Sequence, residues 1–233
     1  MADKNHLWIM KPVNSACGRG VYMINKKTKL VKKKDYLVCE YVTNPHLING
    51  LKYDLRIYVL VTSYDPLKIY MYDEGLTRFA TEQYSTNMKE LSKRFIHLTN
   101  WSVNKYSKKF QVNQNAEQDG EGSKWSLTAL RKEYIKLGID EETLFKRIKD
   151  LIVKTCIAVE SNMMDSMSKL AEHRNNCFEL YGFDVLVDAD LKPWILEVNV
   201  CPSLCSSSPL DRKIKHSLIS DMLNLIGVIP YDK

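Results

Sequence analysis

The sequence predicts an α+β protein that contains several antiparallel strands and a few long helices. Several runs rich in β-branched and aromatic residues lie within the first eighty positions. Apolar residues with helical spacing follow over 125–163 and again over 211–226. Two more strand-like runs, 183–187 and 194–198, lie between these helical stretches. The chain shows no internal repeat and no clean linker, so we expect one domain over residues 1–233.

The composition favours a globular protein over a membrane-spanning, secreted or zinc-binding one. The 233 residues are 45% hydrophobic, which is enough to bury a core. No apolar run is long enough to span a bilayer and the N-terminus lacks a secretory pattern, so we expect a cytoplasmic protein without a membrane partner. The net charge of +6 suits an acidic partner without identifying one. The six cysteines show neither C-x-x-C nor zinc spacing, so reduced thiols are expected.

A glycine-bearing loop lies between the first two expected strands. Residues 7–11 and 21–24 are strand-like, and Gly18-Arg19-Gly20 stands between them. Such a loop can lay backbone N–H groups over phosphates, to which Lys11 would add a positive charge. Neither the P-loop nor the dinucleotide fingerprint is present, because both need a following helix. An ordinary hairpin is the alternative, and the lysine-rich stretch over 26–34 is either a solvated face or a contact for an acidic polymer.

Residues 53–62 have the pattern of a buried central strand. They alternate at first and then become uniformly apolar. Asp65-Pro66 forms a turn, and 67–72 returns as the antiparallel partner. One face of the central strand carries three charged residues, namely Lys52, Asp54 and Arg56. They form either a surface row of ion pairs or a wall that faces phosphate, since charges on a core strand need partners.

The middle of the chain is predicted to be a polar loop followed by two helices. Residues 108–124 are poor in apolar side chains, so we expect a mobile loop that acts as a lid or is an insertion. Residues 125–138 and 141–163 have helical spacing, with Gly138 as a C-cap and Asp140 as an N-cap. The expected inward positions of the second helix are Leu144, Ile148, Leu151, Ile152, Cys156 and Val159. Those of the last helix are Ile214, Leu218, Ile219, Met222, Leu223 and Ile226.

The last two strand-like runs carry three oxygen donors. Glu197 and Asn199 are two positions apart and therefore share a strand face. Asp184, on the neighbouring strand, reaches that face if the hairpin pairs in a suitable register. Two carboxylates and an amide oxygen suit Mg²⁺ that is held partly by phosphate. The alternative is a surface hairpin with alternating polar residues.

The order of these motifs resembles the tubulin tyrosine ligase-like family over almost the whole chain. The matching stretches are 9–12 (IMKP), 18–20 (GRG), 52–59 (KYDLRIYV), 75–80 (GLTRFA), 97–100 (HLTN), 124–125 (KW), 178–184 (FELYGFD) and 191–199 (LKPWILEVN). Residues 209–215 (PLDRKIK) look most like the glutamate-adding branch, the tubulin polyglutamylases.

This resemblance implies an ATP-grasp fold, in which a nucleotide is held between two α+β subdomains. It also implies an ATP- and Mg²⁺-dependent ligase whose partners are free L-glutamate and the acidic C-terminal tails of tubulin in microtubules. The γ-phosphate of ATP would activate a glutamate side chain of the tail as an acylphosphate, which the amine of free glutamate then attacks. Phosphoryl transfer depends mostly on positioning and charge neutralisation. The expected location is the cytoskeleton, including a cilium, flagellum or basal body.

Carried over position by position, the resemblance assigns four groups of residues. Arg56 and Glu197 would be catalytic, with Arg56 steadying the transferring phosphoryl group. Asp184, Glu197 and Asn199 would bind Mg²⁺. Arg78, Ser102, Lys124 and Lys213 would form the glutamate pocket. The nucleotide would be held by Lys11, Arg19, Gly20, Cys39, Glu40, Tyr41, Val42, Lys52, Asp54, Thr99 and Asn100.

The chain departs from the family pattern in places. Cys39 and Glu40 stand where the adenine hinge usually has glutamine and a basic residue, and a thiol cannot copy the paired hydrogen bonds of an amide. Trp101 stands where tyrosine is common. The family core has a further portion before the strand at Trp8, so a chain truncated at its N-terminus is expected.

Two alternatives stay open beside the glutamate ligase: a glycine ligase of the same family, and an inactive module that binds microtubules. A nucleic-acid module fits poorly. The aromatic residues are not interleaved with basic ones as stacking platforms need, and no nucleic-acid motif is present.

Overall fold

The structure of the chain is a computed structural model that describes residues 6–13, 15, 18–26, 28, 35–117, 119–171, 173 and 177–228. A small antiparallel sheet contains the N-terminal strands in the order β2-β1-β3. Its strands are β1 (Trp8–Pro12), β2 (Tyr22–Ile24) and β3 (Tyr36–Glu40). Most of the lysine-rich stretch predicted over 26–34 lies outside the described residues.

A six-stranded antiparallel sheet forms the body, with the order β7-β6-β5-β8-β9 and β4 paired to β5. Its strands are β4 (Leu47–Ile48), β5 (Leu51–Tyr64), β6 (Leu67–Phe79), β7 (Lys124–Ser126), β8 (Glu179–Val187) and β9 (Pro193–Asn199). The predicted central strand and its antiparallel partner are therefore confirmed as β5 and β6. The strand-like hairpin near the C-terminus is confirmed as β8 and β9.

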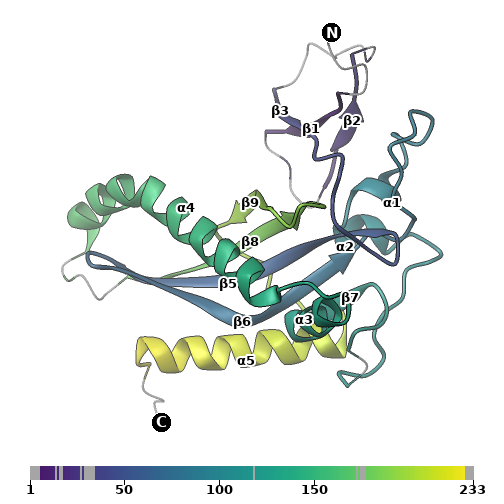
Figure 1. Ribbon diagram of the computed structural model, residues 1–233. Coiled ribbons are helices and arrows are strands. Elements are labelled where there is room, and N and C mark those ends of the chain that lie inside the picture. The colour runs from purple at the N-terminus through teal and green to yellow at the C-terminus, as the bar shows by residue number, and fades with distance from the viewer. Residues whose placement is uncertain are drawn as a thin grey trace.

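Two long helices lie on opposite sides of the body sheet (Figure 1). The helices are α1 (Arg94–His97), α2 (Trp101–Asn104), α3 (Leu127–Lys136), α4 (Glu141–Leu170) and α5 (Pro209–Ile226). The side chain of Asp140 caps α4 by accepting a hydrogen bond from the Thr143 amide, and Ser208 caps α5 in the same way. None of the helices in the described part of the chain is long and apolar enough to cross a membrane.

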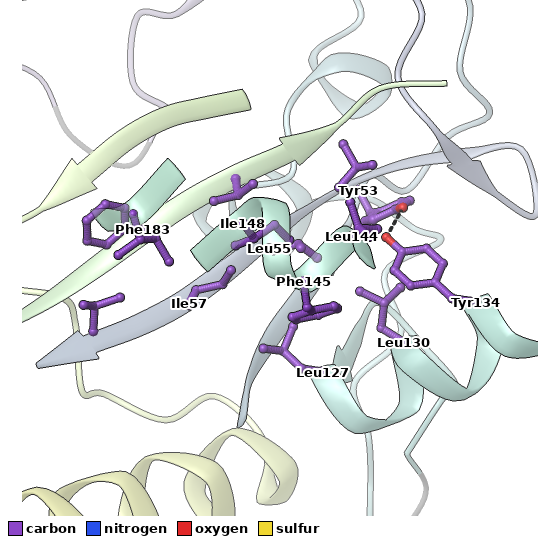
Figure 2. Packing of buried hydrophobic residues seen from close by; sticks show 14 of the residues in the cluster. Tyr53, Leu55, Ile57, Leu127, Leu130, Tyr134, Leu144, Phe145, Ile148 and Phe183 are labelled. Carbon is purple, nitrogen blue, oxygen red and sulfur yellow. Dashed lines mark hydrogen bonds between the residues drawn. The ribbon is translucent and has the colours of Figure 1, made fainter. Parts of the chain in front are cut away.

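The main core lies between the body sheet and α3 and α4. Leu55 and Ile57 of β5 are fully buried against apolar side chains of both helices (Figure 2). Within this core the hydroxyl groups of Tyr53 and Tyr134 are 2.6 Å apart and share a hydrogen bond, which gives both buried groups a partner.

The opposite face of β5 is divided into an apolar end and a charged end. Tyr58 packs with Leu76 of β6 and with Leu210, Ile214 and Leu218 of α5 in a second buried cluster. Because side chains alternate along a strand, Arg56 shares this face with Tyr58 but lies on the charged side of it. The α5 helix therefore covers one end of this face and meets the charged residues at the other.

Three expectations about elements are wrong in detail. Trp125 belongs to β7 and not to a helix, because β7 pairs with β6 through Thr77 and Trp125. Val159 is 43% exposed and Leu223 is 38% exposed, although their spacing placed both inward. Beyond Cys156, the contacts of α4 with the core are made by partly buried methionines, as expected for flexible gap-filling side chains.

The polar segment predicted as a mobile loop is tied to the body. Ser123 is buried, its hydroxyl accepts a hydrogen bond from the Gln111 amide at 3.0 Å, and its carbonyl accepts one from Phe79 at 3.1 Å. Asp119 accepts a hydrogen bond from the amide of Ser126 at 2.8 Å. A role as a lid stays a prediction.

Candidate functional site: a row of charges across the sheet

Charged residues from five neighbouring strands lie side by side across one face of the body sheet. The strand register pairs Lys124 with Arg78 and Arg78 with Asp54. One step along β5, it pairs Arg56 with Asp184 and Asp184 with Glu197. Asp54 and Arg56, two of the three charged residues predicted on one face of β5, thus belong to a larger set that also includes Lys124, Arg78, Asp184 and Glu197.

Asp184 is at the centre of this row. Its Oδ1 accepts a hydrogen bond from Arg56 Nε at 2.5 Å, and its Oδ2 lies 2.8 Å from Arg78 Nη2. Arg78 also makes a two-point contact with Asp54, through Nε at 2.8 Å and Nη2 at 2.5 Å. Burial alone would raise the pKa of Asp184, but the charge of Arg78 and the contact with Arg56 outweigh it and lower this pKa to about 2.

Gly182 makes room for the side chain of Arg56. A Cβ at this position would meet Arg56 Cδ at 3.3 Å and Pro202 Cβ at 2.8 Å. The absence of a side chain therefore lets the arginine lie across β8 to reach Asp184. Sequence reasoning did not find this role, because a glycine inside a strand pattern indicates only that something approaches closely.

A second ion cluster joins β7 to the first turns of α5. Asp211 is 1% exposed, and its Oδ2 accepts a hydrogen bond from Lys124 Nζ at 3.1 Å and one from the Ser207 amide at 3.0 Å. Its Oδ1 lies 2.9 Å from Lys215 Nζ. Burial would raise the pKa of Asp211, but Lys124 and Lys215 outweigh it and lower this pKa.

The cations of these two clusters are slightly more exposed than the three aspartates that they contact. The side chains of Arg56, Arg78, Lys124 and Lys215 are 12%, 11%, 11% and 9% exposed. Those of Asp184, Asp54 and Asp211 are 3%, 4% and 1% exposed. A molecule that approaches this face therefore meets the slightly exposed tips of these cations, held in place by carboxylates underneath, and the exposed carboxylate of Glu197 at the β9 edge of the row. Such an arrangement suits an anionic ligand with more than one acidic group.

The hairpin β8–β9 brings the three predicted metal ligands together. Glu197 pairs with Asp184, and Asn199 pairs with Gly182 and donates from Nδ2 to the Gly182 carbonyl at 3.1 Å. Partial burial and the charge of Asp184 raise the pKa of Glu197. A cation between the two carboxylates would relieve this repulsion, so the donor set fits Mg²⁺. No group of three His, Cys, Asp or Glu side chains suited to a metal occurs among the described residues, and the predicted set has two carboxylates with the amide of Asn199 as its third donor.

Lys11 and the glycine loop connect the small sheet to the body. Lys11 Nζ donates to the Leu196 carbonyl on β9 at 3.4 Å, one position from Glu197. Gly18 adopts a φ of 69°, and its carbonyl accepts a hydrogen bond from Arg94 at 2.5 Å. Arg19 and Gly20 are exposed. The structure thus holds this loop against the segment before α2, in which Thr99 is buried and Asn100 is half-buried.

Asn100 is in close contact with the glycine loop. A Cβ at Gly18 would lie 2.8 Å from Asn100 Oδ1, so a larger residue at Gly18 would displace the amide. Asn100 also precedes α2, which carries the half-buried Ser102. The predicted phosphate loop and the predicted nucleotide residue Asn100 are therefore neighbours in the structure.

Lys52 lies in a buried polar cluster beneath the small sheet. Its Nζ donates to Tyr41 Oη and to the His97 carbonyl, both at 3.0 Å. Burial lowers the pKa of Lys52 to about 8. Burial and the charge of Lys52 lower the pKa of His97 to about 4, which keeps that imidazole neutral.

The predicted adenine hinge leads into this cluster. Cys39 and Val42 are half-buried, and Glu40 is exposed, with its Oε1 2.8 Å from His6 Nε2.

Lys213 lies on another face of α5 than Asp211 and Lys215. It is exposed and lines a surface depression with Arg212, His216 and Ser207, and the hydroxyl of Ser207 accepts a hydrogen bond from Lys124 at 2.8 Å. Sequence reasoning missed Asp211 and Lys215. Their spacing of four along a helix was a usable signal, because residues at i and i+4 share a helix face.

Comparisons with known proteins identify the family. The model of the tubulin-tyrosine ligase family matches residues 1–233. Tubulin polyglutamylase TTLL5 of Homo sapiens is 48% identical over 225 residues, which is 97% of this chain and 18% of that protein. Tubulin monoglutamylase TTLL4 of Mus musculus is 47% identical over 222 residues, covering 95% of this chain and 18% of that protein.

A third relative, tubulin polyglutamylase ttll-5 of Caenorhabditis elegans, is 42% identical over 227 residues, or 97% of this chain and 31% of that protein. The chain therefore spans less than a third of the length of each of these relatives. The family match covers every position of the chain and includes both ion clusters. The chain belongs to the tubulin-tyrosine ligase family.

Proposed function

We propose that residues 1–233 act as one catalytic domain of ATP-grasp type that joins free L-glutamate to glutamate side chains of tubulin C-terminal tails. The observation that carries this proposal is the set of four cations, 9–12% exposed, above three carboxylates that are more deeply buried. Free glutamate has two carboxylates, and a pocket with several cations suits it better than it suits a neutral amino acid. The names of the relatives, tubulin polyglutamylase and tubulin monoglutamylase, agree with this chemistry.

In this proposal the donor glutamate binds to the two ion clusters. Arg78, Lys124 and Ser102 are the predicted contacts, and Lys215 is the better candidate for the role predicted for Lys213, since it lies beside Asp211. The two carboxylates of the donor glutamate bind to these cationic side chains. This binding orients the donor amine toward the activated side chain of the acceptor. Positioning of this kind supplies much of the rate in transfer reactions.

The nucleotide is proposed to lie between the small sheet and the β8–β9 edge. Lys11, the Arg19-Gly20 loop and Lys52 would hold phosphates, and Asp54 would support the site through Arg78. The other proposed contacts are Cys39, Glu40, Tyr41, Val42, Thr99 and Asn100. Arg56 would steady the phosphoryl group as it moves to the acceptor carboxylate, and this forms the acylphosphate that the donor amine attacks.

Asp184, Glu197 and Asn199 would hold Mg²⁺, which when bound neutralises phosphate charge. The raised pKa of Glu197 beside Asp184 supports this assignment, because it reflects a repulsion that a cation relieves. Arg56 and Arg78 keep Asp184 in place independently of the ion.

Transfer of labelled glutamate to microtubules tests the proposal. The chain with ATP and Mg²⁺ is expected to incorporate glutamate, the Glu197→Gln variant to lose incorporation, and the exposed-site control Glu142→Gln to retain it. Circular dichroism would show that all three proteins are folded. Incorporation of glycine instead of glutamate would overturn the donor assignment. No incorporation by the folded chain, together with nucleotide-independent binding to microtubules, would indicate an inactive binding module.

A further inference from the structure

Tyr58 is a buried side chain at the junction between α5 and the charged row. Its ring packs with Leu210 and Ile214, which lie on the same helical turns as Asp211 and Lys215. Its hydroxyl is fully buried and has no hydrogen-bond partner in the part of the chain that the structure describes. Burial raises the pKa of Tyr58 to about 12, and the charges of Arg56 and Asp211 act on it. The hydroxyl is therefore protonated and is available as a donor.

One carboxylate oxygen of Asp211 depends on Lys215 alone. Its Oδ2 accepts hydrogen bonds from Lys124 and Ser207, but its Oδ1 has no aligned hydrogen bond among the described residues. Lys215 Nζ lies 2.9 Å from this Oδ1 as an ion pair and also donates to the Cys205 carbonyl at 2.5 Å. The ion pair with Lys215 alone thus balances the charge at this oxygen.

A buried hydroxyl without an acceptor is unfavourable, and Asp211 Oδ1 would be left in the same state if the ammonium of Lys215 moved away. We propose that Tyr58 is a positioning residue of the donor amino-acid site: when a ligand carboxylate draws Lys215 away from Asp211, the Tyr58 hydroxyl donates to Asp211 Oδ1 in its place. Asp211 then keeps its orientation and continues to hold Lys124 against the ligand. The proton stays on Tyr58 throughout, and the ligand class rests on the proposed function.

The alternative is that the ring of Tyr58 only fills space beside α5. In that case Tyr58→Phe would be neutral in every assay, because the ring is retained. A positioning role predicts a different pattern. Removal of a hydroxyl that lacks a partner does not destabilise the ligand-free chain. It does destabilise the ligand-bound chain, in which Lys215 binds the ligand carboxylate and no longer pairs with Asp211.

Glutamate binding by calorimetry provides the first test, with Tyr64→Phe as the matched control. Tyr64 is buried and shares a 3.0 Å hydrogen bond with Tyr181, far from α5 in sequence. Tyr58→Phe is expected to keep the melting temperature and to weaken glutamate binding about fivefold, with ATP binding unchanged. The control is expected to melt at a lower temperature and to bind glutamate normally. Unchanged glutamate binding by Tyr58→Phe would overturn the proposal.

A ligand-free double-mutant cycle separates this inference from the proposed function. Lys215→Met removes the ammonium that balances Asp211, so Tyr58 becomes the remaining donor for Oδ1. Adding Tyr58→Phe to Lys215→Met is expected to lower the melting temperature by about 3 °C, whereas the same change in the natural chain has no effect. Absence of coupling would overturn the inference. If the natural chain does not bind glutamate, the proposed donor fails and the cycle still decides the role of Tyr58.

Discussion

Replacement of Asp184 by asparagine tests whether charge holds the centre of the site together. The folded pKa of about 2, compared with the ordinary 3.8, means that Asp184 binds its proton less tightly in the folded chain. This difference corresponds to about 2 kcal/mol of unfolding free energy at pH 7. Asparagine has nearly the same shape but leaves Arg56 and Arg78 without a shared anion. The melting temperature at pH 7 should therefore fall by about 4–8 °C for a chain of this size.

The pH dependence provides the decisive assay. Since the folded pKa is depressed, the stabilisation is present above about pH 4 and is lost as the pH falls toward 2. Urea unfolding of both proteins at pH 7 and at pH 3 should show that the difference falls to about half at pH 3. Asp150→Asn is the control, because Asp150 forms an exposed pair with Lys154 that contributes about 0.5 kcal/mol or less. Equal stability of Asp184→Asn and the natural chain at pH 7 would refute the reasoning.

Three further predictions follow from the same geometry. Because burial lowers the pKa of Lys52 to about 8, kcat/KM for ATP should fall as the pH rises above 8, and a flat profile from pH 7 to 9.5 would remove Lys52 from the phosphate site. Lys215→Ala should raise the glutamate KM about tenfold or more and Lys213→Ala should change it less than about twofold, so equal effects would contradict the reassignment. Gly182→Ala should destabilise the chain by about 1–3 kcal/mol in urea, because a Cβ there meets Arg56, and wild-type stability would argue against that role.

Much of the fold could be predicted from local sequence. The apolar run of β5, the Asp65-Pro66 turn, the N-cap at Asp140 and the left-handed Gly138, which follows the C-cap Leu137 of α3, all depend on interactions within a few residues. The shared face of Glu197 and Asn199 also follows from alternation within a single strand. Local rules were sufficient wherever the partner of a residue lay in the same element or the next one.

The features that local sequence did not predict depend on tertiary packing. Trp125 has helical spacing with its followers, but pairing of β7 with β6 makes it part of a strand. Lys213 and Lys215 are both lysines near the start of α5, and the face that this helix turns toward the sheet decides which of them is buried: Lys215 is buried and Lys213 is exposed. The shared use of Asp184 by two arginines depends on the neighbouring strands β6, β5 and β8, which no local pattern reveals.

The order of the strands in the sheet affects the rates at which the site forms during folding and is lost during unfolding. Asp54 and Arg78 are 24 positions apart and belong to one hairpin, whereas Arg56 and Asp184 are 128 positions apart. Closing the longer loop costs more chain entropy, so we expect β8 to join the sheet late in folding. An anionic ligand that binds the row should then slow unfolding and leave the folding rate nearly unchanged, because its site is not yet assembled in the transition state. For a chain of this kind, occupancy by substrate would lengthen the lifetime of the folded state without accelerating its formation.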